Sequence, residues 1–424
     1  MFKSTFSFAF LLLSFGLFAQ DQATIMSYNV LNFPTGNIAG REDTLKQLIN
    51  YVEPDIFLIQ ELKSDSGLQL ILNESFSGLT SSYAATTFVP QQSNSSSNWK
   101  LQQAMIYNTD LFGLVDEGYL MTATRDINKY QLYYRNPNLA SGADTAFVFV
   151  FVTHLKSSQG TSNEEARLEM VQTLTTYLAF LPAEANVIFA GDFNVYSSEE
   201  PAYQEILDST NYIQLKDPIS TPGNWTSSSF HPKSVLTQST RSSSIFGDGA
   251  GGGVDDRFDF VMLSSNMFYN WNTIVYEPDS YYALGNTGSC YNSSITDCND
   301  GEWSNQILSS LYFMSDHLPI VLKLNFGVGT VGLEETLFQE APTSENTITI
   351  KRDYVEVIWG ETEAATIQLQ DAVGRNIYSR VHSLNRGYNR FRISRLQGNK
   401  GMVLVSVISD NERAVCKIVP VGSN

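Results

Sequence analysis

The chain is poor in several residue types, and each scarcity excludes a class of protein. Its 424 residues include 3 cysteines and 4 histidines, too few for a disulfide-built scaffold. The paired cysteines and neighbouring histidines of a zinc site are also missing. Basic residues number 26 against 44 acidic ones, a net charge of −18, which argues against a broad basic surface for nucleic acid. Neither a Gly-Lys-Ser/Thr phosphate loop nor a serine nucleophile motif occurs.

What the chain does contain is enough apolar material for a sizeable core. Hydrophobic residues make up 42% and aromatic residues 12%, which excludes a disordered or collagen-like chain. The length exceeds that of one ordinary domain, so we expect two. Residues 331–424 hold 11 of the basic and 11 of the acidic side chains, so the whole net charge belongs to residues 1–330.

The N-terminus is typical of an export signal. Lys3 precedes an apolar run, Phe6–Phe18, and the small residue Ala19 is followed by a polar segment. This pattern predicts a signal peptide over residues 1–20. An uncleaved membrane anchor is the alternative, but the run is short against the roughly 20 residues that a span needs. We therefore expect a secreted protein with no stable membrane insertion.

Export to an oxidising compartment bears on the cysteines. Cys290 and Cys298 stand eight residues apart in one polar loop and could pair there. Cys416 is left over, and we expect it to be a small buried hydrophobic residue in a strand.

Periodicity predicts a layered arrangement of strands and helices over residues 21–326. The spacing of apolar residues predicts helices at Arg41–Val52 and Asn163–Leu181, the second with Ser162 as N-cap. Strands broken by helices indicate two packed sheets covered by helices, in an α/β or α+β architecture. The apolar runs typical of buried strands are Thr24–Phe33, Asp55–Gln60, Ala104–Tyr107, Phe147–Thr153, Asn186–Ala190, Phe258–Leu263 and Pro319–Leu324.

The pattern changes after residue 326. Seven short alternating runs between residues 348 and 419 predict a small all-β, Ig-like sandwich over residues 345–424. Residues 327–344, which contain Pro342, are the expected linker.

A long polar stretch, Thr221–Asp256, ends in a string of glycines and aspartate, Gly247–Gly253. The string could hold a structural Ca²⁺, although its spacing matches no EF-hand pattern. A flexible loop at the rim of a site is the alternative that its composition favours.

Polar residues recur at the ends of the predicted strands. Taken singly, an Asn or Asp at a strand end most often makes a turn, and a lone His most often has a structural role. As a set they offer the oxygen ligands that Mg²⁺ prefers, together with two imidazoles for proton transfer. The set comprises Asn29, Glu61, His154, Asp192, Asn194, Asp259, Asp316 and His317.

The order and context of these residues resemble the endonuclease/exonuclease/phosphatase superfamily, to which deoxyribonuclease I belongs. The motifs that carry the resemblance are Gly191-Asp192-Phe193-Asn194 and Ser315-Asp316-His317-Leu318-Pro319. It covers about residues 24–326 and implies a four-layer α/β sandwich, two packed sheets flanked by helices. It also implies hydrolysis of phosphoester bonds with Mg²⁺ or Mn²⁺ as cofactor.

The resemblance assigns metal and phosphate binding to five residues. Glu61 would be the principal metal ligand, with Asn29 beside it, and Asp259 would complete the acidic cluster. Asn194 would bind the phosphate. Arg135, in Tyr-Arg-Asn-Pro, falls where deoxyribonuclease I-like members keep a phosphate-binding arginine.

The same resemblance assigns four catalytic roles. His317 would be the general base, oriented by Asp316. Asp192 would position or activate the attacking water. His154 would contact the phosphate or protonate the leaving oxygen.

The last 80 to 90 residues resemble the type A sorting domain of type IX secretion. Thr366–Asp371, Gly387–Arg390 and Lys400–Val405 carry this resemblance. It implies an address read by the secretion machinery and a location outside, or on the surface of, a Gram-negative cell. The alternative is an ordinary carbohydrate- or surface-binding β-sandwich.

Together these features predict a secreted, metal-dependent endonuclease that acts on DNA, binds its substrate transiently and is monomeric, and they leave RNA open as a further substrate. Another phosphoesterase of the same fold, sphingomyelinase-like or a sugar or inositol phosphatase, is the first alternative. In a sphingomyelinase-like protein, the aromatic segment Met267–Leu284 would be the element that faces the lipid, although packing in the core also explains its composition. A non-enzymatic surface-binding protein is the alternative of another class.

Overall fold

The computed structural model divides the chain into two compact units, residues 1–330 and residues 331–424. The predicted signal peptide and nearly all of the predicted linker lie outside the described residues. The described residues are 21–35, 38–94, 100–137, 139, 145–244, 248–269, 272–298, 300–327, 347–351, 354–359, 363–371, 376–384, 387–392, 403–409 and 413–418.

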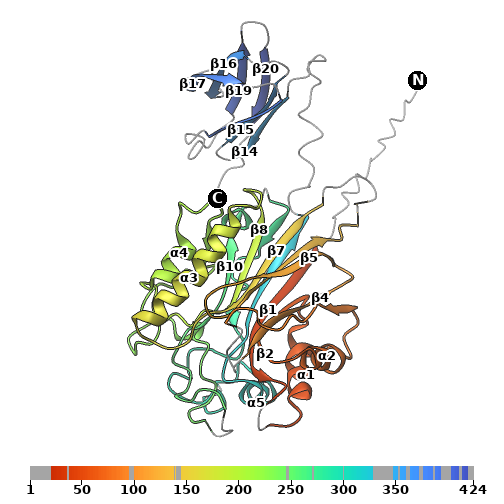
Figure 1. The fold of residues 1–424 in the computed structure, drawn as a ribbon, viewed down its shortest axis with the longest axis vertical. Helices are drawn as coiled ribbons and strands as arrows, with labels where there is room; N and C mark the ends of the chain where they lie inside the picture. The colour runs from red at the N-terminus through yellow and green to blue at the C-terminus, as the bar shows by residue number, and fades with distance from the viewer. Residues whose placement is uncertain are drawn as a thin grey trace, which may run out of the picture. The chain divides into compact units, whose positions relative to one another are not determined.

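Two β-sheets form the centre of the first unit (Figure 1). The first has the strand order β11-β13-β1-β2-β4-β3, with β12 also paired to β13, and the second has the order β5-β6-β7-β8-β10-β9. The pairs β1–β2 and β7–β8 are parallel, and the other pairs are antiparallel. The strands of the first sheet are β1 (Asp21–Phe33), β2 (Ile56–Leu62), β3 (Tyr83–Ala85), β4 (Gln102–Asn108), β11 (Ile274–Tyr276), β12 (Tyr282–Ala283) and β13 (Ile320–Phe326). Those of the second are β5 (Phe112–Leu120), β6 (Ile127–Tyr134), β7 (Phe147–His154), β8 (Asn186–Asp192), β9 (Leu215–Lys216) and β10 (Asp259–Ser264).

Helices cover the outer faces of both sheets, which confirms the predicted four-layer α/β sandwich (Figure 1). Helices α1 (Arg41–Val52), α2 (Asp65–Leu70) and α5 (Asn305–Met314) lie on the side of the first sheet. Helices α3 (Thr161–Leu178) and α4 (Pro201–Leu207) cover the second. Single turns of other helix types are Ile71–Ser75, Lys233–Val235 and Ser265–Phe268.

The start of α3 differs from the prediction. The helix begins one residue before Ser162, with Gly160 as its N-cap and no side-chain cap. Glycine is almost as favourable as serine at an N-cap, because the unpaired N–H groups of the first helical turn can bind water at the surface. None of the helices in the described part of the chain has the length and apolar character that a membrane span requires.

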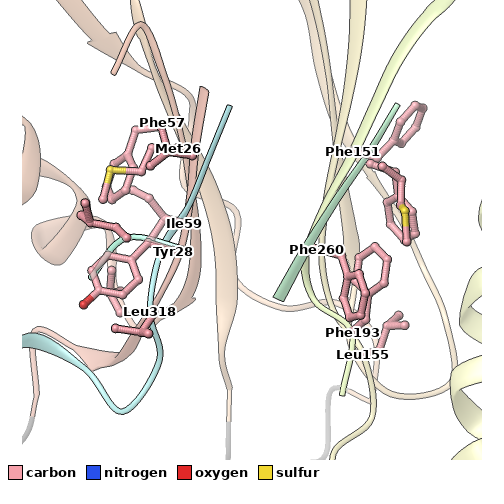
Figure 2. Packing of buried hydrophobic residues seen from close by; sticks show 14 of the residues in the cluster. Met26, Tyr28, Phe57, Ile59, Phe151, Leu155, Phe193, Phe260 and Leu318 are labelled. Atoms are coloured by element: carbon pink, nitrogen blue, oxygen red, sulfur yellow. The ribbon is translucent and has the colours of Figure 1, made fainter. Parts of the chain in front are cut away.

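The alternation of side chains along the strands separates an inner core from two outer ones. Leu58, Val150 and Ile188 belong to the cluster between the sheets. Their sequence neighbours point to the opposite faces, where Phe57 packs under the helices of the first sheet and Phe151 under those of the second (Figure 2). The period of two therefore fixes which residues of each strand face the space between the sheets.

The second unit contains strands alone among its described residues, as predicted for a small all-β sandwich. Its two sheets have the orders β14-β15-β18 and β17-β16-β19-β20. The strands are β14 (Thr347–Lys351), β15 (Tyr354–Trp359), β16 (Glu363–Asp371), β17 (Asn376–Leu384), β18 (Gly387–Arg392), β19 (Val403–Ser409) and β20 (Arg413–Ile418).

Cys290 and Cys298, for which the sequence leaves pairing open, are joined in the structure. The two form a disulfide with their Cα atoms 5.3 Å apart, in the loop before α5. The side chain of Cys416 lies outside the described residues.

Candidate active site

The predicted site residues of the second sheet meet at one end of the core between the sheets. Along β8, Ile188 belongs to the inner core, and alternation brings Asp192 to the same face. His154 ends β7 and stands in register with Asp192, and Asp259 at the start of β10 stands in register on its other side. Three strand ends therefore present these side chains side by side.

Glu61 reaches the same place only because β2 is irregular. A strict alternation from Leu58 would point Gln60 inward, but the pairings of β2 with β1 and with β4 both shift register near Glu61. Glu61 itself has a φ of 61°, in the left-handed region. A bulge of this kind re-aims a side chain. The Glu61 carboxylate accepts a hydrogen bond from the backbone N–H of Asn32, 3.1 Å away, which holds it in place.

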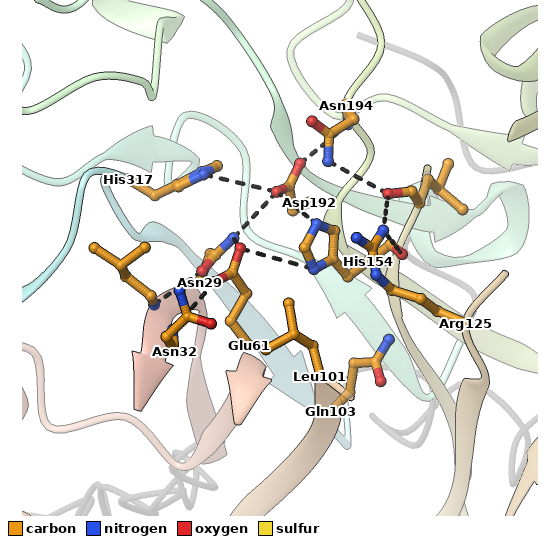
Figure 3. A network of polar contacts seen from close by, with 12 residues as sticks. Asn29, Asn32, Glu61, Leu101, Gln103, Arg125, His154, Asp192, Asn194 and His317 are labelled. Atoms are coloured by element: carbon orange, nitrogen blue, oxygen red, sulfur yellow. Dashed lines mark hydrogen bonds and ion pairs between the residues drawn. The ribbon is translucent and has the colours of Figure 1, made fainter. Parts of the chain in front are cut away.

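Asn29 bridges the two carboxylates at the centre of the site (Figure 3). Its amide nitrogen donates to Oε1 of Glu61 at 3.0 Å and to Oδ2 of Asp192 at 3.1 Å. Its amide oxygen accepts from the backbone N–H of Leu31. The predicted proximity of Asn29 to Glu61 thus agrees with the structure, but Asn29 turns its donor group towards the carboxylates, not its oxygen.

His317 is held by Asp259 and not, as the resemblance suggested, by Asp316. Nδ1 of His317 lies 2.8 Å from Oδ2 of Asp259. The Asp316 carboxylate accepts from the backbone N–H of Ala250 at 2.6 Å and from the amide of Gln238 at 3.2 Å. Asp316 and His317 both contact the side-chain nitrogen of Gln238, but the carboxylate at Nδ1 of His317 is that of Asp259. Asp259, predicted as a metal ligand, is therefore the partner of the imidazole.

The other ring nitrogen of His317 faces the centre of the site. Nε2 lies 3.7 Å from Oδ2 of Asp192 and 2.7 Å from the side-chain nitrogen of Gln238. In the neutral form of His317, with Nδ1–H donated to Asp259, Nε2 carries the lone pair and accepts from Gln238. Gln238 comes from the long polar stretch that the sequence marks as a rim loop, and no sequence signal singles it out.

His154 completes the group on the side of the second sheet. Its Nε2 lies 3.5 Å from Oδ2 of Asp192 and its Nδ1 lies 3.9 Å from Oε1 of Glu61. Both distances exceed those of a hydrogen bond. Nδ1 is buried and has no hydrogen-bond partner among the described residues. A buried polar atom without a partner at this point indicates that a further group belongs in the site.

Burial and charge set the protonation of the site. Burial raises the pKa of Glu61, and it raises that of Asp192 to about 7. Burial and the charge of Arg125 hold the pKa of His154 well below its ordinary value. Burial also acts to lower the pKa of His317, but the charges of Asp259 and Asp192 outweigh it and place that pKa well above the ordinary value.

Arg135 lies at the wrong end of the sheet for the predicted phosphate contact. Strand β6 is antiparallel to β7, and its last residues pair with Phe147 at the start of β7. Arg135 follows β6 there and donates from Nε to the backbone oxygen of Phe112. His154 ends β7 at the opposite end of the same pair, so Arg135 is excluded from the site.

The arginine that the structure places at the site is Arg125, which precedes β6. Its Nη1 donates to the backbone oxygen of Leu155 at 2.8 Å, directly after His154. Asn194, which has a φ of 51°, points its amide nitrogen at the same oxygen, 3.4 Å away. Burial lowers the pKa of Arg125, and the charges of Glu61 and Asp192 act in the opposite direction. The sequence points to Arg125 only when β6 and its antiparallel direction are known.

The donors at the centre of the site fit a divalent cation. Glu61, His154 and Asp192 offer ligand atoms that all lie within 4.8 Å of one another. Two of the three are carboxylates removed from water, where their repulsion is strong. A cation would relieve that repulsion, and oxygen donors suit Mg²⁺ or Mn²⁺. The structural Ca²⁺ that the sequence allows in the glycine string stays a prediction. The Asp248 carboxylate of that string accepts a hydrogen bond from the Asn32 amide.

Two sheets packed face to face between layers of helices, with acidic and imidazole side chains at one end, define a four-layer α/β protein with a candidate metal site. The model of the Endonuclease/Exonuclease/phosphatase family matches residues 26–317, and the chain belongs to this family. Members of the family are phosphoester hydrolases, generally metal-dependent.

Three solved structures that are similar to the chain share little sequence with it. D. rerio TDP2 in complex with a single-strand DNA product is 17% identical, with 72% of this chain and 99% of that chain covered and a TM-score of 0.47. An endonuclease/exonuclease/phosphatase from Bacteroides vulgatus is 15% identical, with 72% and 99% covered and a TM-score of 0.45. The human nocturnin catalytic domain with bound sulfate is 16% identical, with 72% and 97% covered and a TM-score of 0.42. Among curated proteins, no sequence matches significantly.

Proposed function

We propose that the protein is a secreted, Mg²⁺- or Mn²⁺-dependent phosphodiesterase that acts as an endonuclease on DNA, with RNA as a second substrate. The observation that carries the proposal is the pair His317–Asp259, with Nδ1 and Oδ2 2.8 Å apart, next to the buried carboxylate of Asp192 and the partly buried carboxylate of Glu61. An oriented imidazole beside a candidate cation site is the arrangement that activates water for attack on phosphorus.

His317 is the general base of this proposal in its neutral form, which a cation at Glu61 and Asp192 would favour by offsetting the charge of Asp192 that raises the pKa of His317. Its Nε2 takes a proton from the water whose oxygen attacks phosphorus, while the ester bond to the leaving oxygen breaks. Asp259 holds the ring through Nδ1 and stabilises the imidazolium that forms. Asp192, 3.7 Å from Nε2, accepts a hydrogen bond from the same water and aims it.

Three donors on the side of the second sheet hold the phosphate. His154 is neutral, because its pKa lies well below the ordinary value, so it donates a hydrogen bond and is not the acid that protonates the leaving oxygen. The Asn194 amide and the Arg125 guanidinium lie against the backbone of Leu155 next to it. Glu61 and Asp192 would hold the cation, which neutralises charge developing on the phosphate.

The aromatic segment Met267–Leu284 gives no particular support to a lipid substrate. Met267, Ile274 and Leu284 are fully buried, and Tyr276 is nearly so. Core packing accounts for these side chains. The proposal therefore keeps a nucleic acid as the substrate, with a sphingomyelinase-like or sugar phosphatase activity as the alternative outcome of the assay.

The assay compares the wild-type chain with His317→Ala on plasmid DNA, RNA, sphingomyelin and a phosphomonoester, with Mg²⁺ and with chelator. We expect metal-dependent cleavage of DNA, and a loss of about 10²- to 10⁴-fold in kcat for the variant, the usual contribution of a general base. His231→Ala, at an exposed histidine, is the matched control. Near-normal turnover by His317→Ala, or cleavage that survives chelation, would contradict the mechanism.

We also propose that residues 331–424 are an address for type IX secretion and that the protein lies outside, or on the surface of, a Gram-negative cell. The compact all-β second unit and its sequence resemblance support this role. Fused to a periplasmic reporter in a host with the secretion system, these residues should carry the reporter out of the cell. Retention in the periplasm would argue for a binding domain instead.

A further inference from the structure

A pocket of about 720 Å³ opens at the ends of β2 and β4 and shares no residue with the candidate active site. Its walls come from the turn after β2, from α2 and from the chain between the end of β3 and the start of β4, including Lys63, Gln91, Lys100 and Gln102. The volume falls within the range of pockets that bind small organic molecules. It is large enough for one nucleotide unit.

The pocket adjoins the site along the chain and across the sheet. Lys63 follows Glu61 by two residues, so their Cα atoms are at most about 7 Å apart. Gln102, in the pocket wall, pairs with Leu62 of β2. Its neighbours Leu101 and Gln103 are among the residues drawn in the close view of the site (Figure 3). A ligand bound at Glu61 therefore reaches the pocket by extending past the end of β2.

One wall of the pocket is fixed in place by a buried carboxylate. Asp126 accepts hydrogen bonds from the backbone N–H of Gln92 at 2.7 Å, the hydroxyl of Ser93 at 2.6 Å and the amide of Gln102 at 3.1 Å. Asp126 directly follows Arg125, so the same segment positions the arginine of the site and the wall of the pocket. Preorganisation of this kind reduces the entropy lost on binding.

The charge of the pocket is opposite to that of the surrounding unit. Its charged lining residues are Lys63 and Lys100 against the single carboxylate of Asp65. Residues 1–330 carry the whole net charge of −18, so two lysines on one pocket beside the site are a local exception. Lysine binds phosphate as a point charge. The ligand that matches the pocket is therefore anionic and extends from the site.

We propose that this pocket binds the nucleotide adjacent to the scissile phosphodiester, with Lys63 and Lys100 on its phosphate. This inference rests on the proposed function and narrows it: the preferred substrate is a polynucleotide, and an isolated phosphodiester uses only part of the binding surface. The lysines contribute to substrate binding and leave the chemical step to the site.

The test compares two substrates that differ in flanking phosphates. The purified full chain, the double variant Lys63→Gln/Lys100→Gln and the control Lys323→Gln, at an exposed lysine on β13, are assayed with Mg²⁺ at several salt concentrations. The substrates are a single-stranded DNA oligonucleotide and bis(p-nitrophenyl) phosphate, which has one phosphodiester. For the double variant we expect the ratio of the two KM values to shift about tenfold against the oligonucleotide. We also expect its salt dependence to flatten by about 1.4 in log–log slope, roughly 0.7 for each phosphate contact.

Equal effects on both substrates, or no effect on either, would overturn the inference while leaving the proposed function intact. If the wild-type chain cleaves neither substrate, the proposed function fails, and the pocket is then tested by binding alone. Fluorescence anisotropy of the same oligonucleotide with Mg²⁺ should show the flatter slope in the double variant and not in Lys323→Gln. An unchanged slope there would overturn the inference as well.

Discussion

At the scale of single residues, the two carboxylates near His317 have different tasks. Asp259 contacts the imidazole, whereas Asp316 accepts from the backbone of Ala250 and from Gln238. We expect Asp259→Asn to lower kcat by two to four orders of magnitude, because the amide can stabilise the wrong tautomer and cannot stabilise the imidazolium. Asp316→Asn should cost less than about tenfold in kcat and act mainly on the stability of the loop.

Steady-state kinetics on the oligonucleotide, with the melting temperature of each variant, measure the difference. Circular dichroism establishes that both variants are folded. An Asp316→Asn variant that loses as much kcat as Asp259→Asn, with an unchanged melting temperature, would restore the assignment that the sequence alone favoured.

At the scale of elements, the contact between β7 and β8 depends on a glycine. Gly191 has a φ of 142°, and a Cβ there would lie 1.9 Å from the backbone oxygen of Thr153. We expect Gly191→Ala to lower the free energy of unfolding by more than about 3 kcal/mol, since overpacking and backbone strain each cost roughly 1–3 kcal/mol. Urea unfolding measures the loss. Gly118→Ala on β5 is the control, because its nearest neighbour is the flexible end of Lys129, 3.1 Å away.

A Gly191→Ala variant as stable as Gly118→Ala would show that the two strands can separate without cost. If Gly191→Ala is too unstable to purify, the soluble yield and protease sensitivity of the two variants, expressed side by side, give the same comparison.

The same elements show what the sequence can and cannot predict. All seven apolar runs of the first unit are strands, because burial on both faces leaves an unmistakable pattern. The periodicity of the sequence does not predict strands β5 and β6, because polar residues interrupt their alternation and their outer positions are partly exposed. That omission explains the error at Arg135, since only the antiparallel course of β6 places Arg125 at the site. The structure brings Glu61, which the resemblance assigned as a metal ligand, into the candidate site, whereas periodicity alone predicts Gln60 there. The bulge in β2 that causes the difference leaves no mark in the periodicity.

At the scale of the whole molecule, the acidic charge and the phosphate substrate are compatible. The site gathers several of the carboxylates that make residues 1–330 negative, and a bound divalent cation reverses the sign of the field where the phosphate arrives. The opposite charge at Lys63 and Lys100 then extends the attractive surface away from the cation. The net charge argues against tight binding of a nucleic acid over a broad face. It is compatible with transient, metal-dependent binding of a phosphate substrate.

The buried site also links the stability of the metal-free chain to pH. The pKa of Asp192 is about 7 in the fold against 3.8 when unfolded, so the folded state binds the additional proton. The pKa of His317 is likewise raised by folding, and its contribution is complete below 6.5 and is lost as the pH rises through the folded value. Both signs agree. The metal-free protein should therefore lose stability as the pH rises from about 4 through 7 and beyond.

A divalent cation bound by Glu61 and Asp192 should cancel this loss, because it takes the place of the proton that Asp192 binds in the metal-free fold. We expect Mg²⁺ at about 100 times its dissociation constant to add about 2.7 kcal/mol at pH 8, or roughly 5 °C in melting temperature. The gain should shrink below pH 6, where protons compete for the same oxygens. Differential scanning fluorimetry with Mg²⁺ and with chelator, from pH 5.5 to 8.5, measures both trends. Asp192→Asn should show a smaller gain and a flatter pH dependence; a gain that is equal at all pH values and in the variant would place the cation elsewhere.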